Sequence, residues 1–295
     1  MISTLLRLIP HKTWRQKALD AWGADAPRIA VLRLAGTIGP NAPLRGGLNL
    51  AGLAEDIEQA FTMRGVKAVA LAINSPGGSP VQSALIYRRI RALADENELP
   101  VFAFAEDVAA SGGYWLACAG DEIYADESSI VGSIGVIMAG FGFHEALAKL
   151  GIERRIHAAG DNKAMLDPFK PEKPEDVQHL EALQRDVHAA FKDLVRTRRA
   201  GKLTASEETL FNGAFWAGRQ AKALGLIDGI GDLRGVLREK YGERVRLILV
   251  GAGKPWWRRK PAAFVRKSEL AEPERLASGL LAALEDRSLW SRFGL

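Results

Sequence analysis

The chain has 295 residues, of which 47% are hydrophobic and 25% are charged, a composition typical of a globular protein that forms one large domain or two small ones. Its net charge of +5 does not indicate nucleic-acid binding, because 35 acidic residues are interspersed with the 40 basic ones. The only cysteine, Cys118, excludes an internal disulfide and a multi-cysteine metal site. It lies in an apolar run and is therefore predicted to be a buried structural thiol.

Residues 1–26 are predicted to form an N-terminal lead-in helix. The apolar run in this segment is too short and too soon interrupted for a signal peptide, and no run elsewhere is long enough to span a membrane. We therefore expect a cytoplasmic protein.

Strand and helix patterns alternate through residues 27–250, which we expect to form the main domain. The strand candidates are Arg28–Ala35, Ala68–Ile73, Val101–Ala105, Glu122–Ala125, Ile130–Met138 and Arg244–Val250. The helix candidates are Leu48–Met63, Val81–Leu93, Ser111–Ala119 and Pro174–Arg199. This alternation predicts an α/β fold with a mostly parallel sheet flanked by helices, and the last of these helices makes a helical extension.

Residues 251–295 are predicted to be a basic and amphipathic tail. Within it, Lys254–Lys260 combines basic residues with tryptophans, and Pro273–Leu284 has the apolar face of an amphipathic helix. Tryptophan and arginine suit a membrane surface, but a solvated loop explains the same composition equally well. Peripheral contact with a membrane therefore remains open.

Two strand candidates end in residues that are unusual for a plain turn. The first ending is Asn74–Gly78, in which two glycines follow a proline. Glycines let the backbone approach a substrate, and an exposed N–H can stabilise the oxyanion that forms when a carbonyl is attacked. A simple strand-to-helix turn is the competing interpretation.

The second ending places Ser111 between small residues at the start of a predicted helix. Its hydroxyl is a candidate nucleophile, and the N–H of Gly112 is a candidate second oxyanion donor. A serine at this position also serves as an ordinary helix cap, and that interpretation is favoured when Ser111 is considered alone.

A nucleophilic serine needs a general base. None of the five histidines lies in a recognisable catalytic context, although His144 and His157 remain open. A lysine can replace histidine only if burial or nearby positive charge makes it lose its proton. Lys163 has small and apolar neighbours, but most lysines are solvated surface charges, so its position alone does not select it.

Several motifs together resemble one family of enzymes. The runs Asn74–Gly78, Ala110–Tyr114 and Gly132–Val136, followed by Lys163, have the order and spacing of the signal peptide peptidase A family of serine peptidases. The resemblance covers residues 28–250 and corresponds to the short form of the family with a single catalytic module.

The resemblance implies a role for each site residue. Ser111 matches the nucleophile, Lys163 the general base, and Ser133 a second serine that hydrogen-bonds the lysine. The oxyanion and substrate site is assigned to three glycines, Gly77, Gly78 and Gly112. Residues 27–250 would be the peptidase domain, with a crotonase-like fold shared with the Clp protease proteolytic subunit. No metal or other cofactor is expected.

The resemblance also implies substrates and partners. Members of the family cleave signal-peptide remnants and other unfolded, hydrophobic peptides within a homo-oligomer. In short forms, the serine and lysine of one active site come from neighbouring subunits. Two alternatives remain open: a crotonase-type acyl-CoA hydrolase or hydratase, and a non-catalytic, membrane-associated scaffold of the same fold.

Overall fold

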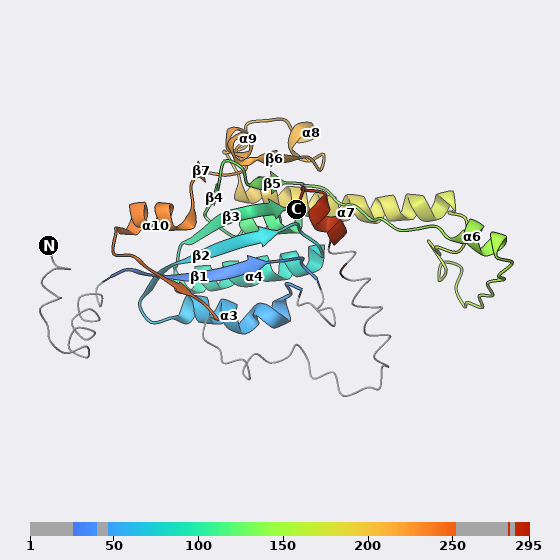
Figure 1. The fold of residues 1–295 in the computed structure, drawn as a ribbon, viewed down its shortest axis with the longest axis horizontal. Helices are drawn as coiled ribbons and strands as arrows, with labels where there is room; N and C mark the ends of the chain where they lie inside the picture. Colours follow the sequence, from blue (N-terminus) through green and yellow to red (C-terminus); the bar gives the residue numbers. More distant parts are fainter. Residues whose placement is uncertain (1–25, 40–46, 252–282, 284–286) are drawn as a thin grey trace, which may run out of the picture.

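A single eight-stranded sheet organises the computed structural model, which describes residues 26–39, 47–251, 283 and 287–295 (Figure 1). The strands are β1 (Arg28–Ala35), β2 (Val66–Ser75), β3 (Val101–Ala110), β4 (Glu122–Ala125), β5 (Ile130–Gly132), β6 (Phe215–Ala217), β7 (Gly229–Ile230) and β8 (Arg246–Leu249). Their order is β6-β5-β3-β2-β1-β8, with β4 beside β3 and β7. Every pair is parallel except β5 with β6, which confirms the expected α/β class with a mostly parallel sheet.

Helices flank this sheet, as the crotonase-like expectation requires. They are α3 (Leu50–Thr62), α4 (Pro80–Asn97), α5 (Gly112–Ala117), α6 (His144–Lys149), α7 (Pro174–Arg198), α8 (Glu207–Leu210), α9 (Gly218–Ala223) and α10 (Leu233–Tyr241). Side chains fix two of the starting points: Asn49 Oδ1 accepts from Gly52 N–H at 2.9 Å before α3, and Ser79 caps α4 with Pro80 in its first turn.

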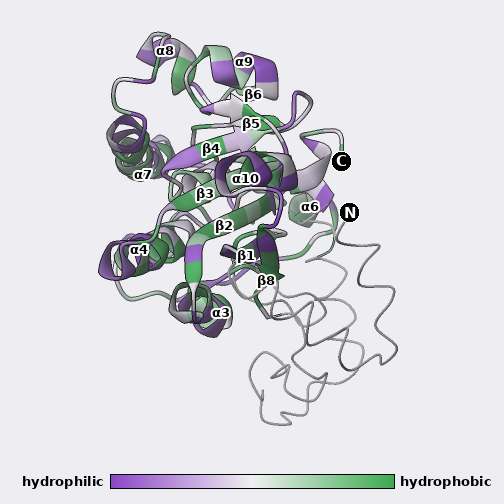
Figure 2. Cartoon of the chain, turned by 90° about the vertical axis from the view of Figure 1, so that its left-hand side faces the viewer, coloured by the Kyte–Doolittle hydropathy of each residue, from purple (hydrophilic) through white to green (hydrophobic). Residues whose placement is uncertain are grey.

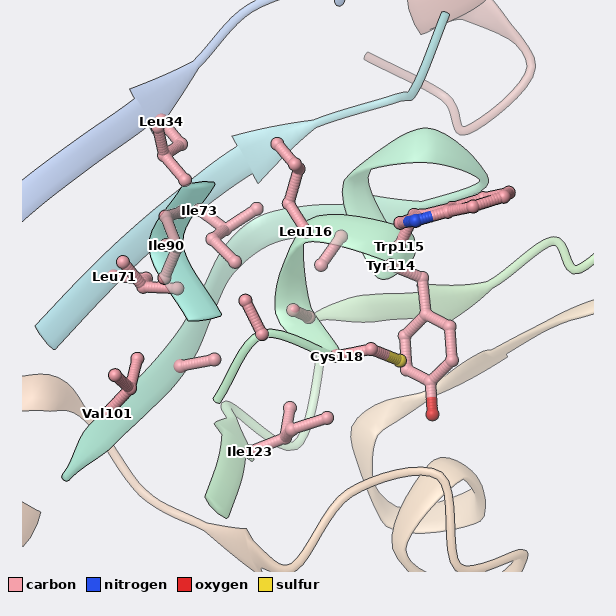
Figure 3. Packing of buried hydrophobic residues seen from close by; sticks show 14 of the residues in the cluster. Leu34, Leu71, Ile73, Ile90, Val101, Tyr114, Trp115, Leu116, Cys118 and Ile123 are labelled. Carbon is pink, nitrogen blue, oxygen red and sulfur yellow. The ribbon is translucent and has the colours of Figure 1, made fainter. Parts of the chain in front are cut away.

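The core lies on both faces of the sheet because β1, β2 and β3 alternate apolar side chains between the two faces. On one face, residues such as Leu71 and Ile73 pack under α3, α4, α5 and α7 (Figures 2 and 3). On the other face, Ala70 and Phe102 pack against α10. Burying one leucine or isoleucine side chain stabilises the fold by about 1.5–3 kcal/mol. Cys118 is fully buried in the first core, as predicted.

Strand β3 has two successive partners, and this arrangement determines where the site forms. Its first half, from Phe102 to Ala105, pairs with β4, and its last three residues, from Val108 to Ala110, pair with β5. The strand candidate Ile130–Met138 is therefore only partly right, because β5 stops at Gly132. Positive φ angles at Gly132 (113°) and Ser133 (53°) turn the chain away from an extended path.

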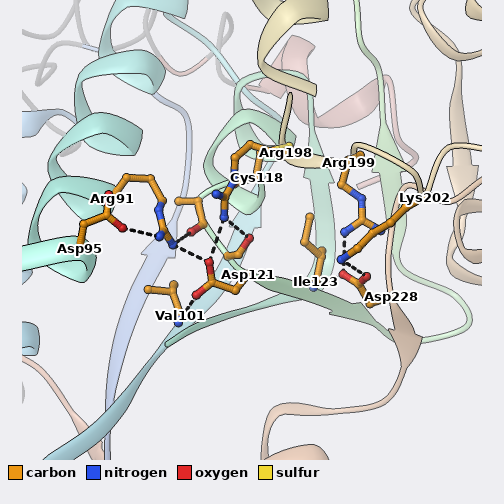
Figure 4. A network of polar contacts seen from close by, with 12 residues as sticks. Arg91, Asp95, Val101, Cys118, Asp121, Ile123, Arg198, Arg199, Lys202 and Asp228 are labelled. Atoms are coloured by element: carbon orange, nitrogen blue, oxygen red, sulfur yellow. Dashed lines mark hydrogen bonds and ion pairs between the residues drawn. The ribbon is translucent and has the colours of Figure 1, made fainter. Parts of the chain in front are cut away.

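A buried charge pair holds the turn before β7 (Figure 4). Asp228 accepts hydrogen bonds from Arg199 at 2.6 Å, from Lys202 at 2.6 Å and from Ile123 N–H at 2.8 Å. The Arg199 side chain is only 2% exposed, and it also donates to the carbonyl of Gly225. The fold thus keeps the Arg199 guanidinium inside by pairing it with a carboxylate and a backbone carbonyl.

The expected helical extension is present, and we call residues 136–184 the arm. The last turns of α7 join the core through Phe191, which stacks on Trp115 at 4.7 Å, and through Val195. The first half of α7 and the rest of the arm before it extend beyond the sheet (Figure 1). Several arm side chains are apolar and exposed: Ile137, Met138, Phe141, Phe143, Leu150, Ile152 and Leu183.

Three predictions concern parts of the chain that are outside the described residues. These are the lead-in helix of residues 1–26 (apart from Ala26), the basic and aromatic segment Lys254–Lys260, and the helix Pro273–Leu284 apart from residue 283. Among the described helices, none combines the length and apolarity that crossing a membrane requires.

Candidate active site

Ser111 occupies a strained turn between β3 and α5. Its backbone adopts φ 53° and ψ −121°, a region that non-glycine residues rarely occupy and that costs about 1–3 kcal/mol. Although Ser111 directly precedes α5, its side chain makes no capping hydrogen bond. The helix-cap interpretation is therefore wrong, and the partly exposed hydroxyl is available for another role.

The turn is possible only because glycines surround it. A Cβ atom added to Gly77 would lie 2.8 Å from Ser111 Cβ and 2.8 Å from Gly112 N. One added to Gly112 would lie 2.6 Å from Ser83 Oγ, and one added to Gly113 would lie 2.4 Å from Ser75 O. The ends of β2 and β3 thus approach each other at backbone distance, as expected from the glycine motifs.

The three predicted glycines differ in the state of their N–H groups. Gly77 N–H donates to the hydroxyl of buried Ser75 at 3.2 Å. Within the described part of the chain, the N–H groups of Gly78 and Gly112 have no acceptor. Gly112 adjoins Ser111 and lies against Gly77, and Gly78 is the next residue after Gly77. Backbone N–H groups next to a serine are the kind of donor that an oxyanion hole needs.

Ser133 lies close to this turn through the backbone. Ser111 N–H donates to Gly132 O at 2.8 Å, and Ser133 is the next residue. Ser133 is 5% exposed, has φ 53° like Ser111, and donates its own N–H to Ala214 O at 2.7 Å. The structure therefore brings the two predicted serines into one region.

Lys163 lies elsewhere, near the outer end of the arm. It is exposed, and its ammonium group has no partner among the described residues. Three residues further on, Leu166 N–H donates to Asp176 in the first turn of α7 at 3.2 Å. About 18 Å of helix separates Asp176 from His188, where α7 meets the body. The structure does not bring Lys163 to Ser111 within one chain.

His188, one of the five histidines that lack a recognisable catalytic context in the sequence, is partly buried near the second serine. Its Nε2 lies 3.2 Å from Ile134 O, one residue from Ser133, whereas His144 and His157 are exposed on the arm. His188 precedes buried Phe191 by three residues, so helical periodicity places both on the inward face of α7. This three-residue spacing is the feature of the sequence that indicates an inward-facing His188.

A cavity of about 740 Å³ lies away from Ser111, and none of the predicted site residues lines it. Its floor includes Ala72, Phe104 and Leu249, beside α10. This cavity therefore does not coincide with the predicted site.

Comparisons with known proteins give a family and several relatives. The sequence profile of peptidase family S49 matches residues 94–244. The chain is 51% identical to a Brucella abortus protein named "Na(+)/H(+) antiporter NhaA" over 99% of this chain and 39% of that protein. It is 33% identical to the Arabidopsis thaliana "Serine protease SPPA, chloroplastic" over 70% of this chain and 31% of the relative.

Two further similarities complete the comparison. An Enterococcus faecium "Putative signal peptide peptidase SppA" is 33% identical over 57% of this chain and 48% of that protein. A solved structure of the 1510-N membrane-bound stomatin-specific protease with a substrate peptide covers 77% of this chain and 93% of that one, with 15% identity and a TM-score of 0.47. The chain spans less than two thirds of the length of each of the three named sequence relatives.

Proposed function

This chain belongs to peptidase family S49, the signal peptide peptidase A family, and we propose that it hydrolyses peptides with Ser111 as the nucleophile. One observation carries this proposal. Ser111 sits in a strained turn where its hydroxyl does not cap the helix, next to Gly112 and packed against Gly77, and within the described residues the N–H groups of Gly112 and of Gly78, which follows Gly77, have no acceptor. A merely structural serine would not need this combination.

The proposed reaction is acyl transfer to water. Neutral Lys163 takes the proton from Ser111 Oγ, and the oxygen attacks the carbonyl carbon of a peptide bond. The N–H groups of Gly78 and Gly112 donate to the oxyanion. The lysine then gives its proton to the leaving amine as the C–N bond breaks, and water activated by the same lysine hydrolyses the ester. Ser133 hydrogen-bonds the lysine and keeps it in position.

In this proposal the lysine comes from a neighbouring copy of the chain. Lys163 is exposed near the end of the arm, and the arm presents apolar side chains such as Met138 and Phe141, which are 61% and 80% exposed. Apolar side chains on a projecting element favour a contact with another subunit. A homo-oligomer would bring the arm of one subunit to the serine turn of the next and bury these residues.

We propose unfolded, hydrophobic peptides, such as signal-peptide remnants, as substrates. The name of the Enterococcus relative, a putative signal peptide peptidase, supports signal peptides, and the name of the Arabidopsis relative supports a serine protease. The antiporter name of the Brucella protein belongs to a longer chain, of which the match covers 39%. Cytoplasmic location and membrane contact through Lys254–Lys260 stay predictions.

The proposal is tested with the purified full chain and a fluorogenic hydrophobic peptide. We expect Ser111→Ala to lower kcat by at least about 1000-fold while the protein keeps its assembly. His188→Gln is the matched control for a histidine base, and we expect it to keep most of the activity. Undiminished cleavage by Ser111→Ala would refute the nucleophile, and loss of cleavage in His188→Gln without loss of folding would favour histidine over lysine.

The same preparation separates the two alternative functions. A crotonase-type enzyme would turn over an acyl-CoA and would not depend on Ser111. A scaffold would assemble but cleave no peptide.

A further inference from the structure

The residues at the end of the chain, 287–295, return to the strand ends that carry the site (Figures 1 and 2). Phe293 is only 7% exposed and forms a small cluster with Val108 and Ala110 of β3, joined by partly buried Ile130 and Trp290. Ala109, between the two β3 residues, faces the opposite side and belongs to the main core. Phe293 thus supports the last residues of β3 from the face opposite to the main core, one residue before Ser111.

Phe293 also contacts β6, the strand that pairs with β5 just before the second serine. Its ring lies 5.1 Å from that of Phe215 in an edge-to-face arrangement. Phe215 pairs with Gly132 across β5 and β6, and the preceding residue, Ala214, accepts the N–H of Ser133. The Phe293 ring therefore packs against the end of β3 and the start of β6, next to the residues that hold the backbones of Ser111 and Ser133.

The ring itself is held firmly. Phe293 N–H donates to Trp290 O at 2.9 Å, which closes a turn at the end of the helical residues 287–291. The guanidinium of Arg292 lies 5.9 Å from the centre of the Phe293 ring. The turn and the packing together give the ring a defined place.

We infer that Phe293 is a positioning residue for the Ser111 and Ser133 turns, an inference that rests on the proposed function. Both serines have φ 53°, and such backbone conformations persist only when the surroundings hold them in place. The main core packs against one face of the strand ends that lead to them, and among the described residues Phe293 is the buried side chain outside the sheet that packs against the other face. Without the ring, β3 and β5 can relax and the Ser111 hydroxyl leaves its productive position.

The test compares Phe293→Ala and Phe293→Leu with a control, Tyr241→Ala, in the full chain. Tyr241 packs edge-on against Phe102 at 6.1 Å, in the α10 cluster and away from the serine turns. We expect Phe293→Ala to lower kcat about 10- to 100-fold with KM within about threefold of the native value, because small misplacements of a nucleophile have effects of this size. We expect Phe293→Leu to restore most of the rate and Tyr241→Ala to lower the melting temperature but leave kcat near native.

A second readout does not depend on peptidase activity. Hydrogen exchange at the Ser111 and Ser133 amides should become at least about tenfold faster in Phe293→Ala and stay unchanged in Tyr241→Ala, because the bonds to Gly132 O and Ala214 O open more often. Native kcat and native exchange in folded Phe293→Ala would overturn the inference while leaving Ser111 as nucleophile. A native protein that cleaves no peptide would overturn the proposed function, and the exchange rates would still decide whether Phe293 holds the turns.

Discussion

The backbone N–H of Ser111 donates a hydrogen bond of 2.8 Å to the carbonyl of Gly132. This bond ties the end of β3 to the end of β5, and it joins two segments whose backbones both turn to positive φ at a serine. The candidate nucleophile and the second serine are therefore placed by one junction of the sheet. Changes at this junction should affect catalysis more than stability.

Mixing two inactive variants tests whether the site is shared between subunits. Ser111→Ala and Lys163→Ala should each be inactive alone. When the two chains are co-expressed and assemble at random, an interface site is complete only if the serine comes from one variant and the lysine from the other. We expect about a quarter of the native activity in such mixed oligomers. Mixed oligomers that remain inactive would show that both residues must lie in the same subunit.

Gly77→Ala should abolish most activity without unfolding the protein. The added methyl group would lie 2.8 Å from Ser111 Cβ and Gly112 N, at a residue with φ 106°. The turn must then shift, and we expect kcat/KM to fall by about 100-fold or more, the size of effect seen when an oxyanion donor is lost. The control is Gly65→Ala, which also has positive φ (74°) but open space around it. It should cost about 1–2 kcal/mol of stability and leave activity unchanged, and equal activity losses in both variants would contradict the steric explanation.

Cys118 should resist thiol reagents in the folded protein. Burial raises the pKa of the Cys118 thiol to about 12, so the reactive thiolate is scarce at pH 8.5 and the sulfur is inaccessible. We expect no labelling by iodoacetamide over an hour in native buffer and complete labelling in denaturant, measured by mass spectrometry. Rapid stoichiometric labelling of the native protein would show that this core opens readily.

Asp228→Asn should destabilise the fold by about 3 kcal/mol at pH 7, because it leaves the 2%-exposed guanidinium of Arg199 without its charge partner. Burial by itself acts to raise the pKa of Asp228, but hydrogen bonds from Arg199 and Lys202 outweigh it and the pKa is lowered. Because the pKa of Asp228 is lower in the folded protein than in the unfolded chain, its carboxylate stabilises the fold at every pH above its ordinary, unfolded pKa. This stabilisation is lost as the pH falls through that value toward the lower folded pKa.

Urea unfolding at pH 7 and below pH 4 measures the difference in free energy of unfolding between the native protein and Asp228→Asn. We expect this difference to be smaller at the lower pH. The control, Asp95→Asn, changes a carboxylate whose side chain is 70% exposed and should cost less than about 1 kcal/mol. A difference for Asp228→Asn that does not depend on pH would contradict the ionic explanation.

The sequence determined the elements that depend on nearby residues. Apolar runs such as Val101–Ala105 predicted buried parallel strands, the long periodic pattern of Pro174–Arg199 predicted α7 to within one residue, and the apolar neighbours of Cys118 predicted its burial. These features follow from local periodicity and burial, so they can be read from a short window of residues.

Only the tertiary structure decided the features that depend on contacts between distant segments. It showed that Ser111 is no helix cap, that β5 stops at Gly132, that Lys163 lies outward on the arm, and that Phe293 reaches the strand ends. Each result depends on a backbone conformation or a packing partner contributed by residues far away in the chain. Such contacts form only when the whole sheet has assembled, and no local pattern records them.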